Sequence, residues 1–381
     1  MLTSSALIFI SYHPGSLIEY EQIKNKQPKK KANILIICDH PYLNQEIIDL
    51  YSKRFDRVII LPLIRYQPNI LSGFFRLWRF HKLFRKEIAS ILEAISEYDI
   101  ISDCSAYLPV NVLISELRRD VKFKRLVSIR QDRRYNLDID IFRTALAFIY
   151  IFFFRLSLVW VHRVHKYTYC REPRDEIILF RDKFFEKHLS KEVKPRSAPV
   201  AYLTWPLRSR GSFEDTVIFY SDIDFRSDAS ILSEEEFRKR LMIFFKKFAE
   251  VYKNCRIICK PHPSNIRGIL PGLEQVKYEL YQGGLISQMH LEQLIRNVRA
   301  CYSISSTSLL YSAQRGIASY AMYKYLGFGG IYPRVYFETD FVKDNPFLYA
   351  LTSIEEIAAI DSLDAESALR ERAISYTAKK E

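Results

Sequence analysis

The sequence predicts an α/β protein of two domains, each built on a parallel sheet covered on both faces. The chain has 381 residues, which is too long for one ordinary hydrophobic core. Short apolar runs alternate with helix-like stretches in both halves, as in parallel sheets with crossover helices. Between the halves, residues 185–215 lose this periodicity and contain three prolines, a glycine and mixed charge, which favours a linker.

Apolar runs bounded by turn residues predict the strands of the first half. They span residues 6–11, 33–38, 57–62, 99–102 and 125–129. Two stretches between them, residues 44–55 and 74–95, have apolar residues at helical spacing. The second of these helices has a strongly basic face, made by Arg76, Arg79, Lys82, Arg85 and Lys86. The alternation of strands and helices predicts a parallel sheet.

The second half repeats the alternation after the linker. Strands are expected over residues 216–220, 256–260, 300–304 and 317–322, and helices over 233–252, 291–297 and 308–315. The first of these helices opens with Ser-Glu-Glu-Glu, an N-terminal capping signal, and the last stops at Gly316. We therefore expect an N-terminal domain over residues 1–200 and a C-terminal domain over residues 201–381.

The net charge of +13 belongs almost entirely to the first half. Residues 1–200 contain 34 Lys and Arg against 22 Asp and Glu, whereas residues 201–381 contain 23 against 22. A basic domain suits an anionic partner such as a membrane surface, an acidic glycan or a nucleic acid, and an inert basic surface is the alternative. The aromatic residues are mostly interleaved with aliphatic ones, which argues against nucleic-acid binding.

Cysteine usage and the chain start bear on location. The six cysteines form no CxxC pair and predict buried thiols in a reducing compartment. The apolar start lacks a basic n-region and a small-residue cleavage site, so we expect no signal peptide. The expected location is cytoplasmic, and peripheral attachment to the inner face of the cell membrane is the alternative to a free protein.

Residues 141–161 form the most apolar segment of the chain's first half. Arg143 and Arg155 interrupt it, and the apolar run between them is too short to span a bilayer. A buried helix is one interpretation. The other is a helix lying in the membrane interface, which Trp160 and the nearby basic residues favour.

Chemically capable residues follow two strands of the second half. The strand at 256–260 leads into Lys260-Pro261-His262-Pro263, where two prolines stiffen the loop around the imidazole. Ligands of open α/β sheets bind at the carboxyl ends of strands. At such a place His262 can donate a hydrogen bond to a leaving phosphate or act as a general acid, and Lys260 adds a positive charge. A turn with an incidental histidine is the alternative.

A hydroxyl cluster follows the strand at 300–304 and opens the next helix. It consists of Ser305, Ser306, Thr307 and Ser308, and Ser303 comes just before it. A helix N-terminus offers unpaired N–H groups to an anion, and hydroxyls bind phosphate oxygens directly. Capping of the helix alone would need only one hydroxyl. Together with the Lys-Pro-His-Pro loop, the cluster predicts a site for a donor phosphate.

This combined pattern resembles the bacterial sialyltransferases and polysialyltransferases, and most nearly the lipooligosaccharide sialyltransferases. In that group a His-Pro motif ends one strand, and a Ser/Thr cluster follows one helix and one strand later, as His262-Pro263 and Ser305–Ser308 do here. The resemblance covers most of the second half and, more faintly, the first. It implies a GT-B-like fold, in which two Rossmann-like domains face each other across a cleft.

The resemblance also implies the chemistry. The donor would be a CMP-activated sugar, transferred with inversion at the anomeric carbon and without a metal or other cofactor. His262 would assist the departure of CMP while the hydroxyl cluster holds its phosphate. The acceptor would be a glycan or glycolipid of surface polysaccharide or lipooligosaccharide synthesis, held by the N-terminal domain, and an anionic membrane would be a peripheral partner.

The general base is the least defined part of this prediction. In the group it comes from an acidic pair followed by glycine, and the best match is Gln131-Asp132-Arg133, which keeps only Asp132. Neighbouring arginines make such a carboxylate a weaker base. Asp224, just after the strand at 216–220, is a second candidate, and Asp103 at the end of 99–102 is a candidate for lining the acceptor side.

Other functions remain open. A His-Pro loop would also serve transfer of Kdo or glycerol phosphate, and the altered acidic motif favours a non-catalytic glycan- or membrane-binding relative. The eight histidines have no metal-binding spacing, and only Asp138-Ile139-Asp140 and Asp222-Ile223-Asp224 form a DxD pattern, so no metal site is predicted. GxGxxG and Walker patterns are absent, which argues against dinucleotide or ATP use.

Overall fold

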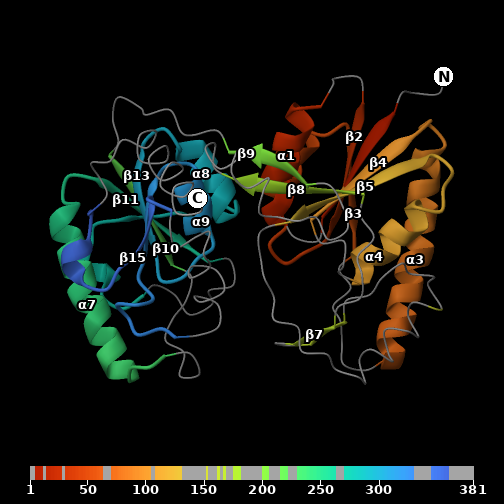
Figure 1. Ribbon diagram of the computed structural model, residues 1–381. Coiled ribbons are helices and arrows are strands. Elements are labelled where there is room, and N and C mark those ends of the chain that lie inside the picture. The colour runs from red at the N-terminus through yellow and green to blue at the C-terminus, as the bar shows by residue number, and fades with distance from the viewer. Residues whose placement is uncertain are drawn as a thin grey trace, which may run out of the picture. The chain divides into compact units, whose positions relative to one another are not determined.

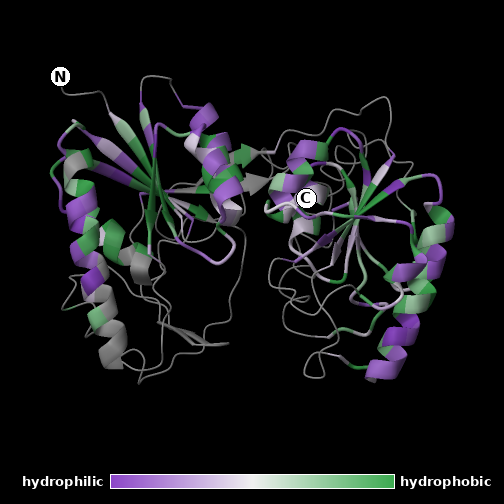
Figure 2. Ribbon diagram, turned by 180° about the vertical axis from the view of Figure 1, so that it is seen from behind, coloured by the Kyte–Doolittle hydropathy of each residue, from purple (hydrophilic) through white to green (hydrophobic). Residues whose placement is uncertain are grey.

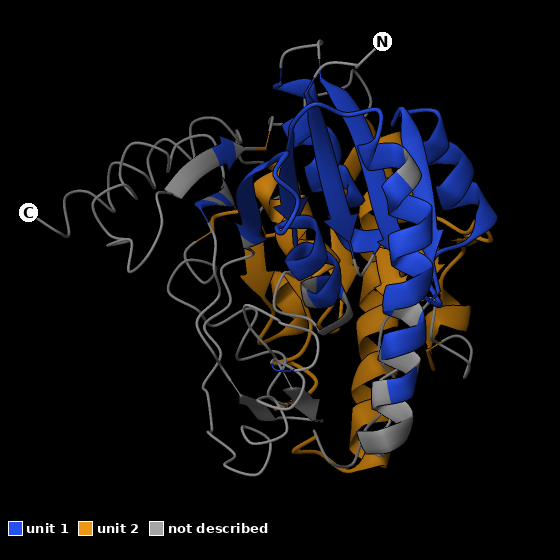
Figure 3. Ribbon diagram, turned by 90° about the vertical axis from the view of Figure 1, so that its right-hand side faces the viewer, with its two compact units in different colours: residues 1–180, 193–203 blue, residues 181–192, 204–381 orange. Residues whose placement is uncertain are grey.

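The computed structural model contains two compact units, each with its own parallel sheet. It describes residues 5–11, 14–27, 31–62, 70–103, 108–130, 152, 161–163, 166–168, 175–181, 200–205, 215–221, 230–262, 270–329 and 345–359. Unit 1 comprises Met1–Phe180 and Val193–Leu203, and unit 2 comprises Arg181–Glu192 and Thr204–Glu381 (Figure 3). Helices cover both faces of each sheet (Figure 1), which confirms the predicted α/β fold class.

The sheet of unit 1 has seven strands in the order β3-β2-β1-β4-β5-β8-β9. Their bounds are β1 (Ala6–Ser11), β2 (Ala32–Cys38), β3 (Arg57–Leu61), β4 (Tyr98–Ser102), β5 (Phe123–Arg130), β8 (Glu176–Arg181) and β9 (Val200–Thr204). The pairs from β3 to β8 are parallel, and the strand order reverses between β1 and β4. A short antiparallel hairpin, β6 (Val161–Arg163) with β7 (Lys166–Thr168), stands apart from this sheet.

Alternating side chains of the central strands bury both faces of this sheet. Its helices are α1 (Leu17–Asn25), α2 (Gln45–Ser52), α3 (Ile70–Leu92) and α4 (Leu108–Leu117). Ile8, Ile10 and Ile36 pack in one cluster with Phe84 of α3 and Leu113 of α4. Because both faces are covered, the middle parts of the central strands are apolar and appear green in Figure 2.

Unit 2 has six strands in the order β12-β11-β10-β13-β14-β15, all paired in parallel. Their bounds are β10 (Thr216–Ser221), β11 (Arg256–Pro261), β12 (Glu279–Leu280), β13 (Val298–Ser303), β14 (Ala318–Ala321) and β15 (Leu348–Ala350). Numbered within the unit, this is the 3-2-1-4-5-6 order of dinucleotide-binding folds, with its reversal between β10 and β13. Ligands of such sheets bind outside the carboxyl ends of the strands at that reversal.

Three helices of unit 2 position the site. They are α7 (Glu234–Val251), α8 (Ser287–Leu294) and α9 (Ser308–Gln314). Phe244, Phe245 and Phe248 of α7 are fully buried against one face of the sheet, and α8 and α9 lie on the other face (Figure 1). The predicted helices at 233–252 and 308–315 are confirmed within two residues at each end, and Gly316 ends the second with a φ of 77°.

Two sequence-based expectations are wrong in detail. β9 lies within residues 185–215, which were predicted to be a linker. The strand is a short apolar run, and the prolines and charged residues around it remove the periodicity on which the prediction depended. α8 begins at Ser287 rather than 291, because its first turn, Ser-Gln-Met-His, has a single aliphatic residue and so gives no helical periodicity.

Two further findings bear on location. No helix in the described part of the chain combines the length and apolar character needed to cross a bilayer. Of residues 141–161, only Phe152 and Val161 lie within the described residues, so the interpretation of that segment stays a prediction. Cys38, Cys259 and Cys301 are buried free thiols, as predicted, and Cys255 is a partly buried one.

Candidate functional site

The carboxyl end of β11 holds His262 at the edge of the sheet in unit 2. Tyr220 and Ser221 of β10 lie opposite Lys260 and Pro261 in the parallel ladder. The ladder continues one residue further, because the N–H of His262 donates to the carbonyl oxygen of Ser221 at 2.7 Å. The half-buried His262 therefore follows the strand as predicted, with its backbone fixed to the neighbouring strand.

Burial and charge set the protonation of this imidazole. Burial lowers the pKa of His262, and the nearby Lys260 ammonium lowers it further. The imidazole is therefore neutral at pH 7 and offers one N–H donor. Of the two roles expected for His262, this favours hydrogen-bond donation to a phosphate over proton transfer from an imidazolium.

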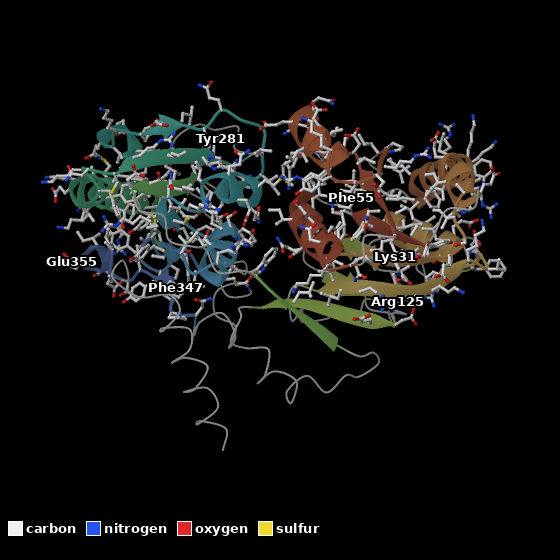
Figure 4. All side chains as sticks on the ribbon, turned by 90° about the horizontal axis from the view of Figure 1, so that it is seen from above. Lys31, Phe55, Arg125, Tyr281, Phe347 and Glu355 are labelled. Carbon is white, nitrogen blue, oxygen red and sulfur yellow. The ribbon has the colours of Figure 1, made fainter. Side chains whose placement is uncertain are left out.

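Lys260 lies inside the unit rather than on its surface. It is 3% exposed, and its Nζ lies 5.0 Å from the ring centroid of Tyr281. Tyr281, labelled in Figure 4, directly follows β12 and packs on the ring of His290 with centroids 4.0 Å apart. Burial, Lys260 and Arg256 lower the pKa of His290 to about 4. Lys260 thus supplies positive charge to both imidazoles from within the fold.

The residues of the hydroxyl cluster, with Ser303 before it, differ in their hydrogen bonds and in their burial. Oγ of Ser303 accepts the N–H of Ser306 at 3.2 Å, and Oγ of Ser306 accepts the N–H of Ser308 at 3.3 Å. The expectation of unpaired N–H groups at this helix start is therefore wrong for these two residues. A hydroxyl that accepts one hydrogen bond keeps its own proton to donate, so the partly exposed Ser306 can still bind a phosphate oxygen. Ser305 and Ser308 are buried, and Thr307 is partly exposed.

His262 and the hydroxyls end three neighbouring strands. Ser303 and Lys260 lie on either side of Tyr220, in β13 and β11. Neighbouring strands are about 4.8 Å apart, so the ends of β11 and β13 are about 10 Å apart. Between them, Oγ of Ser221 is buried and has no hydrogen-bond partner among the residues that the structure describes, and the whole residue is 1% exposed. Its hydroxyl is a further polar group at the strand reversal, the place at which open α/β sheets bind their ligands.

Sequence reasoning noted Ser303 as the first hydroxyl of the run that ends at Ser308 but did not assign it to the phosphate site, and it did not single out Ser221. Each is the last residue of an apolar strand, which is the signal that could have identified them. Tyr281 and His290 were also missed, since neither belongs to a motif and only the fold brings them to Lys260.

The two acidic candidates, Asp132 and Asp224, lie outside the described residues. Their roles stay predictions. The same holds for both DxD tripeptides. Within the described part of the chain, no three His, Cys, Asp or Glu side chains gather closely enough to hold a metal ion.

Asp103, the weaker acidic candidate, follows β4 at the strand reversal of unit 1. Its Oδ2 accepts hydrogen bonds from Oγ of Ser11, at 3.1 Å, and from Oγ of Ser16, while its N–H donates to the Tyr20 hydroxyl at 2.8 Å. Its Oδ1 is buried, and no hydrogen-bond partner for it lies within the described part of the chain. Burial raises the pKa of Asp103 even though these hydroxyls lower it. A carboxylate with a raised pKa is a stronger base than an ordinary surface carboxylate.

Comparisons with known proteins identify the fold. No family model and no curated protein matches the chain. Among solved structures, LpCGTa in complex with UDP is similar at 12% identity, over 97% of this chain and 94% of that one, with a TM-score of 0.53. A UDP-glucosyltransferase from Polygonum tinctorium that glucosylates indoxyl is similar at 10% identity, over 98% and 93% of the chains, with a TM-score of 0.52.

The chain has the GT-B glycosyltransferase fold. The likeness extends over nearly the full length of both compared chains, so both Rossmann-like units belong to it. The predicted GT-B-like fold is confirmed. At 10–12% identity the likeness concerns the fold alone, and it does not extend to the sialyltransferase group.

Proposed function

We propose that the chain is an inverting, metal-independent glycosyltransferase that uses a CMP-activated sugar. The observation that carries the proposal is the edge of unit 2, where His262, Ser221 and Ser303 end three adjacent strands at the reversal of a GT-B fold. The Lys-Pro-His-Pro and Ser/Thr motifs favour sialic acid or a related ulosonic acid as the sugar. The acceptor would then be a glycan or glycolipid of surface polysaccharide or lipooligosaccharide synthesis.

Each donor-site residue has a role that suits its environment. The neutral His262 donates a hydrogen bond to the phosphate of CMP. Ser305, Ser306, Thr307 and Ser308 form the other side of the phosphate site. Lys260 adds positive potential from within the fold without contacting solvent. These donors act most strongly on the phosphate as it gains charge, which is where transition-state stabilisation is needed.

The reaction is a single displacement. The acceptor hydroxyl oxygen forms a bond to the anomeric carbon while the bond from that carbon to the phosphate oxygen breaks. The electron pair of the broken bond leaves with CMP, and a carboxylate takes the proton of the acceptor hydroxyl.

Three carboxylates are candidates for this base. Asp132 and Asp224 are favoured by their sequence positions. Asp103 is favoured by its place at the strand reversal of unit 1 and by its raised pKa. Unit 1 would in each case hold the acceptor, and its excess of Lys and Arg suits an anionic glycan or a phospholipid surface.

Nucleotide binding is the first test. Binding of CMP, CDP and UDP is measured by calorimetry on the whole chain, with His262→Ala as the variant. We expect CMP to bind and the variant to bind it at least tenfold more weakly, since a hydrogen bond to a charged group contributes about 1.5–3 kcal/mol. If CMP does not bind, the donor assignment is wrong. Preferred binding of UDP would instead favour a UDP-sugar donor, the nucleotide found with LpCGTa.

Turnover is the second test. CMP-sialic acid, CMP-Kdo and CDP-glycerol are offered separately with mixed glycan acceptors, and released CMP is measured for the wild type and for Asp132→Asn, Asp224→Asn and Asp103→Asn. The base is the residue whose change lowers kcat while CMP still binds. Release of CMP from CMP-Kdo or from CDP-glycerol would favour those donors. Binding of CMP without any turnover would favour a non-catalytic glycan-binding relative.

A further inference from the structure

The outward face of α3 in unit 1 combines large apolar side chains with positive charge. Three apolar side chains are more than half exposed: Phe75 at 58%, Trp78 at 52% and Leu83 at 52%. On the inward side, Phe84 and Ile88 are buried in the core of the unit. The exposed apolar residues are therefore not needed to hold the helix on the sheet.

Basic residues occupy the same face. Arg79, Lys82, Arg85 and Lys86 are all exposed. An α-helix turns by about 100° per residue, so Phe75, Lys82 and Lys86 all lie within about 20° of one line drawn along the helix. The three residues extend over about 17 Å of its length. Trp78 lies to one side of that line and Leu83 to the other. We call this set of seven residues the α3 face, and in Figure 2 polar and apolar residues alternate along it.

The positive charge of the α3 face is largely unbalanced. Among the residues that the structure describes, Arg79, Lys82 and Lys86 form no ion pair, while Arg85 pairs with Glu116 of α4 at 2.6 Å. The one exposed carboxylate on this stretch, Glu87, lies about 100° around the helix from Lys86.

A comparison with α7 shows that this pattern is not typical of the exposed helices here. That helix also exposes apolar side chains, including Met242 at 50%. Three of its five cations, however, pair with carboxylates of the same helix: Arg238 with Glu234 at 2.7 Å, Arg240 with Glu236 at 3.1 Å and Lys247 with Glu250 at 3.8 Å. With five Lys and Arg against four Glu, α7 is close to neutral. The stretch of α3 has five Lys and Arg against one Glu, so the α3 face suits an anionic and partly apolar surface.

We propose that the α3 face docks on an anionic lipid bilayer. Tryptophan and phenylalanine favour the headgroup region, and long basic side chains reach lipid phosphates while their stems stay in apolar surroundings. The helix would lie flat in the interface and would not cross the membrane. This inference is independent of the glycosyltransferase proposal, because it requires neither donor binding nor turnover. It assigns peripheral attachment to α3 rather than to residues 141–161.

Vesicle binding tests the proposal. The whole chain is sedimented with phosphatidylcholine vesicles containing 30% phosphatidylglycerol, and with phosphatidylcholine alone. Each cation near such a surface contributes about a fivefold gain in partition coefficient. We therefore expect Lys82→Gln/Lys86→Gln to weaken binding to the anionic vesicles about 30-fold. Phe75→Ser/Trp78→Ser removes exposed apolar area whose contribution to membrane binding is similar to that of the two lysines. We expect this variant to bind the anionic vesicles more weakly by a similar factor.

Matched variants separate this face from other causes. Lys239→Gln/Lys246→Gln on the exposed side of α7 makes the same charge change and is expected to leave binding within twofold of the wild type. Quenching of tryptophan fluorescence by brominated lipid is expected to persist in Trp160→Phe and to vanish in Trp78→Phe. Trp205 does not interfere, because it is 2% exposed.

Several outcomes would overturn the proposal. Equal weakening by the α7 and α3 charge variants would mean that net charge alone drives binding. Loss of quenching in Trp160→Phe would assign the contact to residues 141–161. A dimer in solution that Phe75→Ser/Trp78→Ser dissociates, without vesicle binding by the wild type, would mean that a second copy of the chain covers the α3 face.

Discussion

His290 is expected to make unit 2 sensitive to acid. Its side chain is packed at 4.0 Å on the ring of Tyr281, and the residue is 4% exposed. Burial, Lys260 and Arg256 lower its pKa from 6.5 to about 4. As the pH falls below 6.5, the unfolded chain binds a proton at this residue before the folded chain does. The free energy of unfolding therefore falls through this window and levels off below the folded pKa.

The magnitude follows from the two pKa values. One pKa unit corresponds to about 1.4 kcal/mol, so protonation of His290 is expected to remove about 3 kcal/mol of stability between pH 6.5 and pH 4. About 2 kcal/mol of this is lost by pH 5. His290→Phe keeps an aromatic ring against Tyr281 but cannot bind a proton. Its free energy of unfolding should therefore fall about 2 kcal/mol less than that of the wild type between pH 7 and pH 5.

Tryptophan fluorescence during urea unfolding measures this difference. A Trp78→Phe/Trp160→Phe background leaves Trp205, which is buried in unit 2 with its ring 5.0 Å from Tyr311, as the reporter of that unit. His262, whose pKa is also lowered, contributes in the same direction to both proteins and cancels in the comparison. If His290→Phe and its parent lose the same stability between pH 7 and pH 5, the reasoning is refuted.

The same urea assay tests three other features of unit 2. Tyr302→Phe should lower the free energy of unfolding by about 1–3 kcal/mol, and by more than Tyr252→Phe, because the Tyr302 hydroxyl contacts that of Tyr252 at 2.6 Å and also accepts the N–H of Ala358 at 3.3 Å. Equal losses would contradict this. Gly272→Ala should lower it by about 1–3 kcal/mol. The glycine has a φ of +89°, and an added Cβ would lie 2.9 Å from Cα of Met242, so an unchanged stability would count against the backbone argument. Ser233→Ala should cost about 1 kcal/mol and Ser233→Gly only a few tenths, since Oγ of Ser233 accepts the N–H of Glu236 at 3.2 Å at the start of α7. A larger loss for the glycine variant would show that capping is not the cause.

The strands of both sheets were predictable because each is buried on both faces. A central parallel strand is apolar over most of its length, so β1, β2 and β10 appear in the sequence as nearly continuous apolar runs, and β13 does so after Arg299. Strand order was not predictable in this way. The strand order depends on which apolar runs pair with each other. No local sequence pattern indicates that β11 and β13 are the two strands that flank β10.

Helices were predictable only where one face is polar. α3 and α7 have charged outward faces and clear helical periodicity. α4 is apolar over most of its length because it packs into the core, so its periodicity is weak and it was missed. The first turn of α8, which the sequence did not indicate, nevertheless shapes the surroundings of Lys260. It supplies His290, whose lowered pKa makes this part of unit 2 sensitive to acid.

The candidate site was predictable as a location but not as an arrangement of charges. Residue types and spacing pointed to the ends of two strands, and the topology brings those ends to the same edge. The sequence could not reveal that Lys260 is buried with its ammonium 5.0 Å from the ring centroid of Tyr281, or that burial and this charge together lower the pKa of His262 and keep it neutral. This difference changes the expected chemistry. A neutral imidazole binds a singly charged phosphodiester donor less strongly than an imidazolium would, but its hydrogen bond strengthens as the leaving phosphate gains its second charge. An interaction that grows as charge develops lowers the barrier, whereas one already formed in the ground state does not. Burial of His262, aided by the Lys260 charge, thus favours departure of the nucleotide over tight binding of the intact donor.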